Sequence, residues 1–138
     1  MRNYTVLLIA VLLLSTSAAL AQQPPDQAIE RGVGDFVTTI RRGSLADAVR
    51  KIDDCWEQLA HAPRDLPRAI YCSALNFAAA DFDERASSTF STGQTISLVE
   101  ARVRARRGLS AAGISPTSAD GFIELIRQRS IAATSRHF

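Results

Sequence analysis

Four arginines within six residues are the densest cluster of chemically active side chains in this sequence: Arg102, Arg104, Arg106 and Arg107. A guanidinium group donates hydrogen bonds in a fixed planar geometry and pairs with carboxylates and phosphates. At about 100° per residue on a helix, the four positions spread over about 200° and predict a positive patch, not a narrow stripe. Two interpretations stay open. The patch docks an anionic surface or partner, or its arginines pair with acidic residues of the same chain.

The only two cysteines, Cys55 and Cys72, can form a disulfide, a redox pair or part of a zinc site. Redox pairs usually have the spacing C-x-x-C, which is absent here. Zinc needs three or four ligands, and only His61 lies nearby in the sequence. We therefore predict one structural disulfide.

The other reactive side chains predict no catalytic, cofactor-binding or metal-binding residue. The two histidines, His61 and His137, lie at an expected helix end and near the chain end, where the helix dipole favours a positive charge. The acidic residues within 81–84 lack the spacing of a calcium-binding loop and are interpreted as a solvated helix end. Trp56, the lone tryptophan, is interpreted as a core anchor. The sequence contains neither H-E-x-x-H nor G-x-S-x-G.

Two helices must position the cysteines. Apolar residues recur at spacings of three and four over residues 45–59, after a capping Ser44 and before a terminating Pro63. A second helix begins near Asp65, and its residues 69–82 are apolar nearly all round, which is typical of a central helix. The midpoint between the cysteines falls on the turn at 63–64, so an antiparallel hairpin would bring them face to face.

The remaining segments predict further short helices and no strand. A first helix spans residues 29–40, weakened by Gly32 and Gly34. Residues 87–95 are polar and predict a loop. A capping box at residues 97–100 starts another helix, which ends near Gly113. A last helix opens near residues 116–120. The predicted fold class is all-α: a small bundle of four to five short helices, with one disulfide joining a helical hairpin.

The first 21 residues have the three parts of a secretory signal peptide. A basic start precedes an apolar run of about a dozen residues and an A-x-A site that ends at Ala21. The apolar run is shorter than the roughly 20 residues that span a bilayer, and we expect no transmembrane helix in the mature chain. We predict cleavage near Ala21 and a periplasmic or secreted location. A flexible leader would cover 22–27 and a single helical domain 28–138.

Composition narrows the function without naming it. Once Arg2 is removed with the signal peptide, the 16 basic and 14 acidic residues of the whole chain leave a net charge of +1, which argues against nucleic-acid binding. The leading hypothesis is a non-enzymatic binding, accessory or inhibitor-type factor. It would act on another envelope or secreted protein, or on an anionic surface, without a cofactor. The alternatives are an envelope-stress or chaperone-like protein and a small hydrolase without a recognisable motif.

Overall fold

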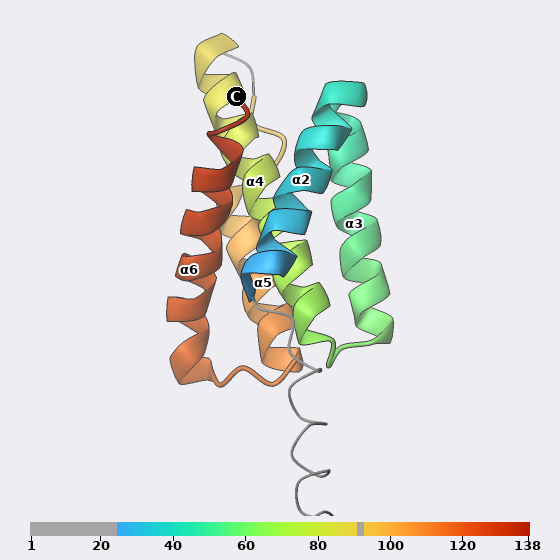
Figure 1. The fold of residues 1–138 in the computed structure, drawn as a ribbon, viewed down its shortest axis with the longest axis vertical. Helices are drawn as coiled ribbons and strands as arrows, with labels where there is room; N and C mark the ends of the chain where they lie inside the picture. Colours follow the sequence, from blue (N-terminus) through green and yellow to red (C-terminus); the bar gives the residue numbers. More distant parts are fainter. Residues whose placement is uncertain (1–24, 91–92) are drawn as a thin grey trace, which may run out of the picture.

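The computed structural model describes residues 25–90 and 93–138, and the predicted signal peptide lies outside them. These residues fold into five helices and no strand, which confirms the predicted all-α bundle (Figure 1). The helices are α2 (Pro25–Arg42), α3 (Leu45–His61), α4 (Leu66–Phe90), α5 (Leu98–Ala111) and α6 (Pro116–Thr134).

Helix α4 is the centre of the bundle, as its sequence predicts. The other four helices all pack against it. Every residue from Cys72 to Ala80 is buried, and most of them are small, which allows the neighbouring helices to approach closely. The hydroxyl of buried Ser73 donates to the carbonyl oxygen of Ala69 at 2.7 Å, so this polar group does not disturb the apolar packing.

One end of the core is closed by an aromatic cluster that joins distant parts of the chain. Phe36 of α2 is fully buried, and its ring centroid lies 5.6 Å from that of Phe82 on α4. The ring of the C-terminal Phe138 lies 4.9 Å from Phe82, centroid to centroid. Offset and edge-on aromatic contacts of this kind stabilise beyond the area they bury.

Short polar motifs set the helix ends. Ser44 caps α3 and forms a complete capping box with Asp47. Ser97 caps α5, but the expected box is only half present: its hydroxyl accepts from the N–H groups of Val99 and Glu100, while the Glu100 carboxylate pairs with Arg104. Helix α5 ends just before Gly113, near the predicted position, and this glycine has a φ of +103°, as is common after a helix end.

Two boundaries differ from the sequence prediction. Helix α2 begins at Pro25, so residues 25–27 of the predicted leader are helical. Proline is favourable at the first position of a helix, because the N–H group that it lacks would have no acceptor within the helix there. Helix α4 continues to Phe90, through half of the predicted loop 87–95. The hydroxyls of Ser88 and Thr89 both bond the carbonyl oxygen of Arg85, so these polar residues are accommodated within the helix.

The interpretation of residues 81–84 as a solvated helix end was wrong at Asp83. This side chain is 3% exposed, and one carboxylate oxygen accepts the N–H groups of Thr95 and Ile96, each at 2.6 Å. Charge-assisted bonds to backbone donors compensate for burying a carboxylate. Asp83 therefore holds the segment before α5 against the central helix.

Candidate functional site

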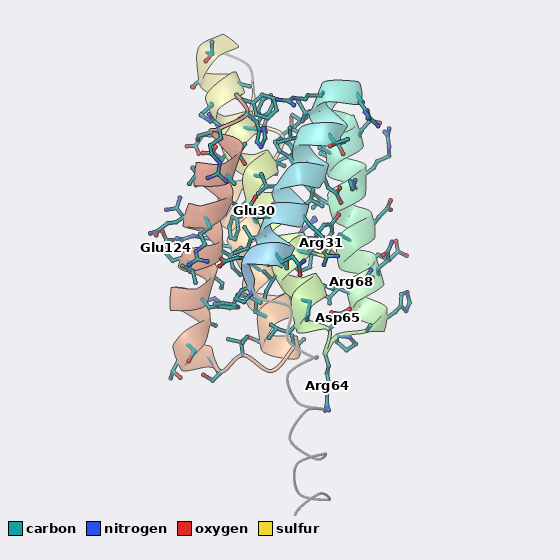
Figure 2. The ribbon with its side chains drawn as sticks, in the orientation of Figure 1. Glu30, Arg31, Arg64, Asp65, Arg68 and Glu124 are labelled. Atoms are coloured by element: carbon teal, nitrogen blue, oxygen red, sulfur yellow. A yellow bond between two sulfur atoms is a disulfide. The ribbon has the colours of Figure 1, made fainter. Side chains whose placement is uncertain are left out.

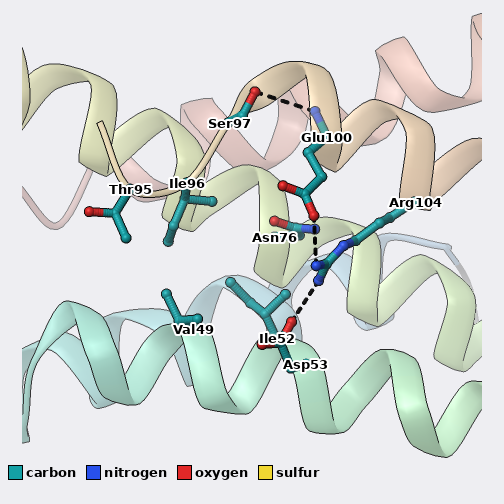
Figure 3. A pocket seen from close by; sticks show the side chains of 9 residues that line it. All are labelled: Val49, Ile52, Asp53, Asn76, Thr95, Ile96, Ser97, Glu100 and Arg104. Atoms are coloured by element: carbon teal, nitrogen blue, oxygen red, sulfur yellow. Dashed lines mark hydrogen bonds and ion pairs between the residues drawn. The ribbon is translucent and has the colours of Figure 1, made fainter. Parts of the chain in front are cut away.

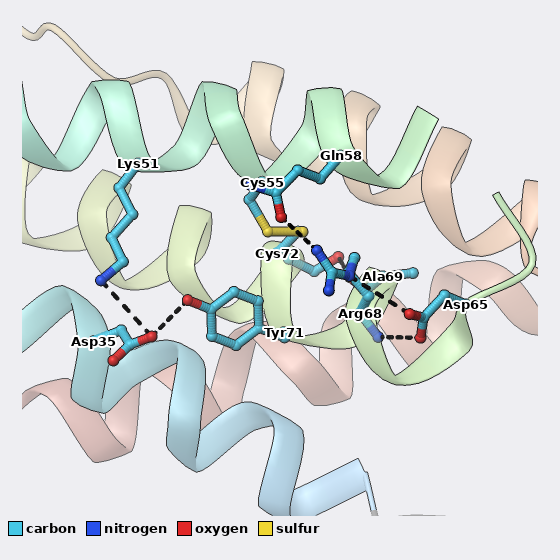
Figure 4. The surroundings of a disulfide bond; sticks show 10 residues. Asp35, Lys51, Cys55, Gln58, Asp65, Arg68, Ala69, Tyr71 and Cys72 are labelled. Atoms are coloured by element: carbon cyan, nitrogen blue, oxygen red, sulfur yellow. Dashed lines mark hydrogen bonds and ion pairs between the residues drawn. A yellow bond between two sulfur atoms is a disulfide. The ribbon is translucent and has the colours of Figure 1, made fainter. Parts of the chain in front are cut away.

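The predicted disulfide is confirmed. Cys55 of α3 and Cys72 of α4 are bonded, with their Cα atoms 5.7 Å apart across the antiparallel hairpin (Figure 4). Cys72 is fully buried, and the described residues contain no free cysteine. No thiol nucleophile is therefore present among them.

A polar network beside the disulfide links three helices. The Tyr71 hydroxyl donates to the Asp35 carboxylate at 2.6 Å, and the Lys51 ammonium lies 3.7 Å from the same carboxylate (Figure 4). Burial, together with the bond to Asp35, raises the pKa of Tyr71 well above its ordinary value of 10. Tyr71 therefore acts as a neutral donor that ties α4 to α2.

The four arginines of the predicted patch divide between the two sides of α5. Arg102 and Arg106 face α6, where they pair with Glu124 and Asp120. Arg104 and Arg107 lie on the side of α3, where both line a pocket. Both interpretations of the patch therefore keep support: three arginines have carboxylate partners within the chain, and three are exposed to solvent.

The α6 side of α5 carries a groove that is lined by apolar and charged side chains. We define the α5–α6 groove by its lining residues, which combine apolar and charged side chains: Val99, Arg102, Val103, Arg106, Asp120, Ile123 and Glu124. Val99 is 72% exposed and Val103, one turn later, is 49% exposed. The ion pairs of the two arginines cross the groove between helices, so apolar contact and charge are available together.

Glu124 is the electrostatic centre of this groove. Figure 2 shows it on α6, on the opposite side of the bundle from Arg68 and Asp65. Its carboxylate accepts hydrogen bonds from two nitrogen atoms of Arg127, the shorter of which is 2.6 Å, and it also forms an ion pair with Arg102. Hydrogen bonding to Arg127, helped by Gln128 and by the charges of both arginines, lowers the pKa of Glu124 to about 2.

The lowered pKa of Glu124 predicts an acid-dependent loss of stability. A carboxylate whose pKa is lower in the folded than in the unfolded protein stabilises the fold above the unfolded pKa, here 4.5, and loses that contribution as the pH falls toward about 2. We expect the urea midpoint of the wild type to fall over this range and that of Glu124→Gln to fall less. Urea titrations at several pH values test this, and parallel curves for the two proteins would contradict it.

The opposite side of α5 faces α3, and both helices pack on α4. The Trp56 side chain of α3 lies against Gly108 of α5, and the gap beside this contact forms two pockets. Arg104 bridges this gap: its guanidinium donates to Asp53 of α3 and to Glu100 of α5, each at 2.7 Å. Arg107 has no carboxylate partner in the ranges 25–90 and 93–138. The pocket beside these arginines is lined mainly by apolar atoms, including those of Trp56 and Gly108.

Two polar groups lie on this side: the indole N–H of Trp56, which the sequence analysis interpreted as a core anchor, and the side chain of Asn76, which it did not single out. Trp56 is only partly buried, and its indole N–H has no hydrogen-bond partner among the described residues. Asn76, in the middle of α4, is 3% exposed and lines a second pocket, separate from the one beside Trp56. The one signal that could have identified Asn76 is a polar amide inside an otherwise apolar helix.

The histidines stay at the ends of elements, His61 in the last turn of α3 and His137 beside the C-terminus. Within residues 25–90 and 93–138, no three His, Cys, Asp or Glu side chains gather as a metal site would require. None of the described helices is long and apolar enough to cross a membrane.

No protein-family model, curated protein or solved structure shows significant similarity to this chain.

Proposed function

We propose that this chain is an exported, non-enzymatic binding protein that engages a partner protein through the α5–α6 groove. The observation that carries the proposal is the exposure of Val99 and Val103, one helical turn apart, on a surface bordered by arginines. Protein interfaces combine an apolar centre with a polar rim and are enriched in arginine. Two adjacent exposed valines on such a surface fit this anatomy.

The charges of the groove indicate the chemistry of the partner. The groove is lined by two arginines and two carboxylates, and the side chains of Arg102 and Arg106 are more than half exposed, so the carboxylates of a partner can reach them. Surface ion pairs contribute only about 0–1 kcal/mol each, and the arginines can exchange their present partners at little cost. We infer a partner that presents an apolar side chain flanked by carboxylates.

Export is supported by the first 21 residues and by the disulfide. The charged start, apolar run and A-x-A site have the organisation of a cleaved signal peptide. Disulfides such as Cys55–Cys72 persist mainly in oxidising compartments. We therefore propose that the partner is another envelope or secreted protein.

Site-specific photo-cross-linking tests the proposed face. A benzophenone amino acid replaces Val103 in the full chain, expressed with its signal peptide, and a matched control carries it at the exposed Glu57 of α3. We expect one dominant cross-linked protein at position 103 and none at 57. Adding Arg102→Glu and Arg106→Glu should abolish the product while circular dichroism stays unchanged, since both side chains are exposed.

Other outcomes contradict the proposal and favour a different function. Equal cross-linking at positions 103 and 57 would remove the α5–α6 groove from consideration. Many weak products that increase at low pH would favour the chaperone-like alternative. Turnover of cell-wall or ester substrates by the purified mature chain would favour the hydrolase alternative.

A further inference from the structure

Asn76 presents an unusual combination of burial and unmet hydrogen bonding. The residue is only 3% exposed in the central helix, and its carboxamide has no hydrogen-bond partner among the described residues. A carboxamide offers two N–H donors and an oxygen with two lone pairs. Buried polar side chains in native proteins are nearly always bonded to protein groups or to water, so this carboxamide is free to bond whatever molecule enters the space in front of it.

The Asn76 carboxamide opens into a small pocket between α3, α4 and α5. The pocket has a volume of about 110 Å³. Val49 and Ile52 of α3 and Ile96, before α5, form its apolar walls (Figure 3). Because a cavity of about 150 Å³ accepts the six carbons of benzene, this one holds about four non-hydrogen atoms.

Charged side chains surround the mouth of the pocket. Figure 3 shows the Asn76 carboxamide beside the ion pair of Glu100 and Arg104, with Asp53 on the other side of that arginine. Two carboxylates and one guanidinium leave a net charge of −1. Arg104 is paired with both carboxylates, so the net negative charge favours a cation over an anion, and each carboxylate retains free lone pairs that can accept its N–H groups.

We propose that this pocket binds a small primary ammonium compound. The ammonium group has three N–H donors, which the oxygen of Asn76 and the carboxylates of Asp53 and Glu100 can accept. A short alkyl chain would contact the apolar walls, which favours an organic cation over a hydrated metal ion. The site lies on the opposite side of α5 from the α5–α6 groove and is independent of the proposed function.

Nuclear magnetic resonance provides a direct test, because the side-chain NH₂ group of Asn76 has its own signal. The full mature chain, labelled with ¹⁵N, is titrated with n-propylammonium chloride at constant ionic strength. We expect saturable shifts of the Asn76 side-chain signal and of the backbone signals of Ile52 and Ile96. The same-sized neutral alcohol n-propanol should bind more weakly by up to about fivefold, the upper limit for one exposed ion pair.

Neighbouring carboxylates give a matched pair of variants. Asp53 lines the pocket, whereas the next residue, Asp54, is exposed and does not. We expect Asp53→Asn to weaken propylammonium binding about fivefold and Asp54→Asn to leave it unchanged, although both remove the same charge. Asn76→Leu should abolish binding. If that variant does not fold, Glu100→Gln replaces it, since the Glu100 side chain is 60% exposed.

Three results would overturn the proposal. Linear, unsaturated shifts would mean that the pocket holds only water. Equal affinities for propylammonium and n-propanol would show an apolar cavity without charge recognition. Equal effects of Asp53→Asn and Asp54→Asn would show general attraction of cations to the surface and not a site at Asn76.

Discussion

Reduction of the Cys55–Cys72 disulfide is expected to lower the free energy of unfolding by about 3 kcal/mol. The bond joins residues 17 apart in sequence and restricts the unfolded chain by closing that loop. The folded hairpin keeps its other contacts, so the effect acts mainly on the unfolded state. Urea unfolding of the oxidised and reduced mature chain, followed by circular dichroism, measures the difference.

The double variant Cys55→Ala/Cys72→Ala separates the cross-link from the chemistry of the thiols. It should lose at least as much stability as the reduced wild type, because both cysteines are buried and smaller side chains leave space in the core. A loss below about 1 kcal/mol in both proteins would contradict the chain-entropy account. It would mean that the unfolded α3–α4 hairpin is already compact.

The parts of the fold that sequence reasoning predicted are those governed by local rules. Helical periodicity identified α3, a continuous apolar run identified α4, and symmetry about their turn paired Cys55 with Cys72. All three depend on short separations along the chain. The cap at Ser44 and the helix end at Gly113 follow equally local hydrogen-bond rules.

The errors occurred where distant parts of the chain meet. The polar residues after Asp83 indicated a loop, but α4 continues to Phe90, and Asp83 binds backbone N–H groups 12 and 13 residues further along. A carboxylate near a helix end looks solvated until the segment that covers it is known. Burial at such a position is a tertiary property.

In the candidate site, too, the features set by local sequence were predicted and those set by distant contacts were not. Sequence reasoning found the arginines, but not that α5 would turn Arg102 and Arg104 toward different neighbouring helices. The partner of Arg104, Asp53, lies 51 residues away in the sequence. Asn76 was overlooked because the pocket that it enters exists only once α3, α4 and α5 are assembled.

Gly32 provides the second large expected effect, and its sign is opposite to the sequence expectation. A glycine inside a helix is usually a weakness that alanine repairs. At Gly32, however, an added Cβ atom would lie 2.7 Å from the carbonyl oxygen of Tyr71 and 3.0 Å from the amide nitrogen of Leu75. Both are backbone atoms of α4, so relief requires the two helices to separate. We expect Gly32→Ala to destabilise by about 1–3 kcal/mol.

Gly34, two residues further along α2, is the matched control. It is exposed, and an added Cβ atom there would meet nothing within 4 Å. Gly34→Ala should therefore stabilise by up to about 1 kcal/mol, through helix propensity and the lower entropy of the unfolded chain. Urea unfolding of the two variants measures both changes. If Gly32→Ala were as stable as Gly34→Ala, the close approach of α2 to α4 would not be a requirement of the fold; opposite signs would show that Gly32 is needed for packing.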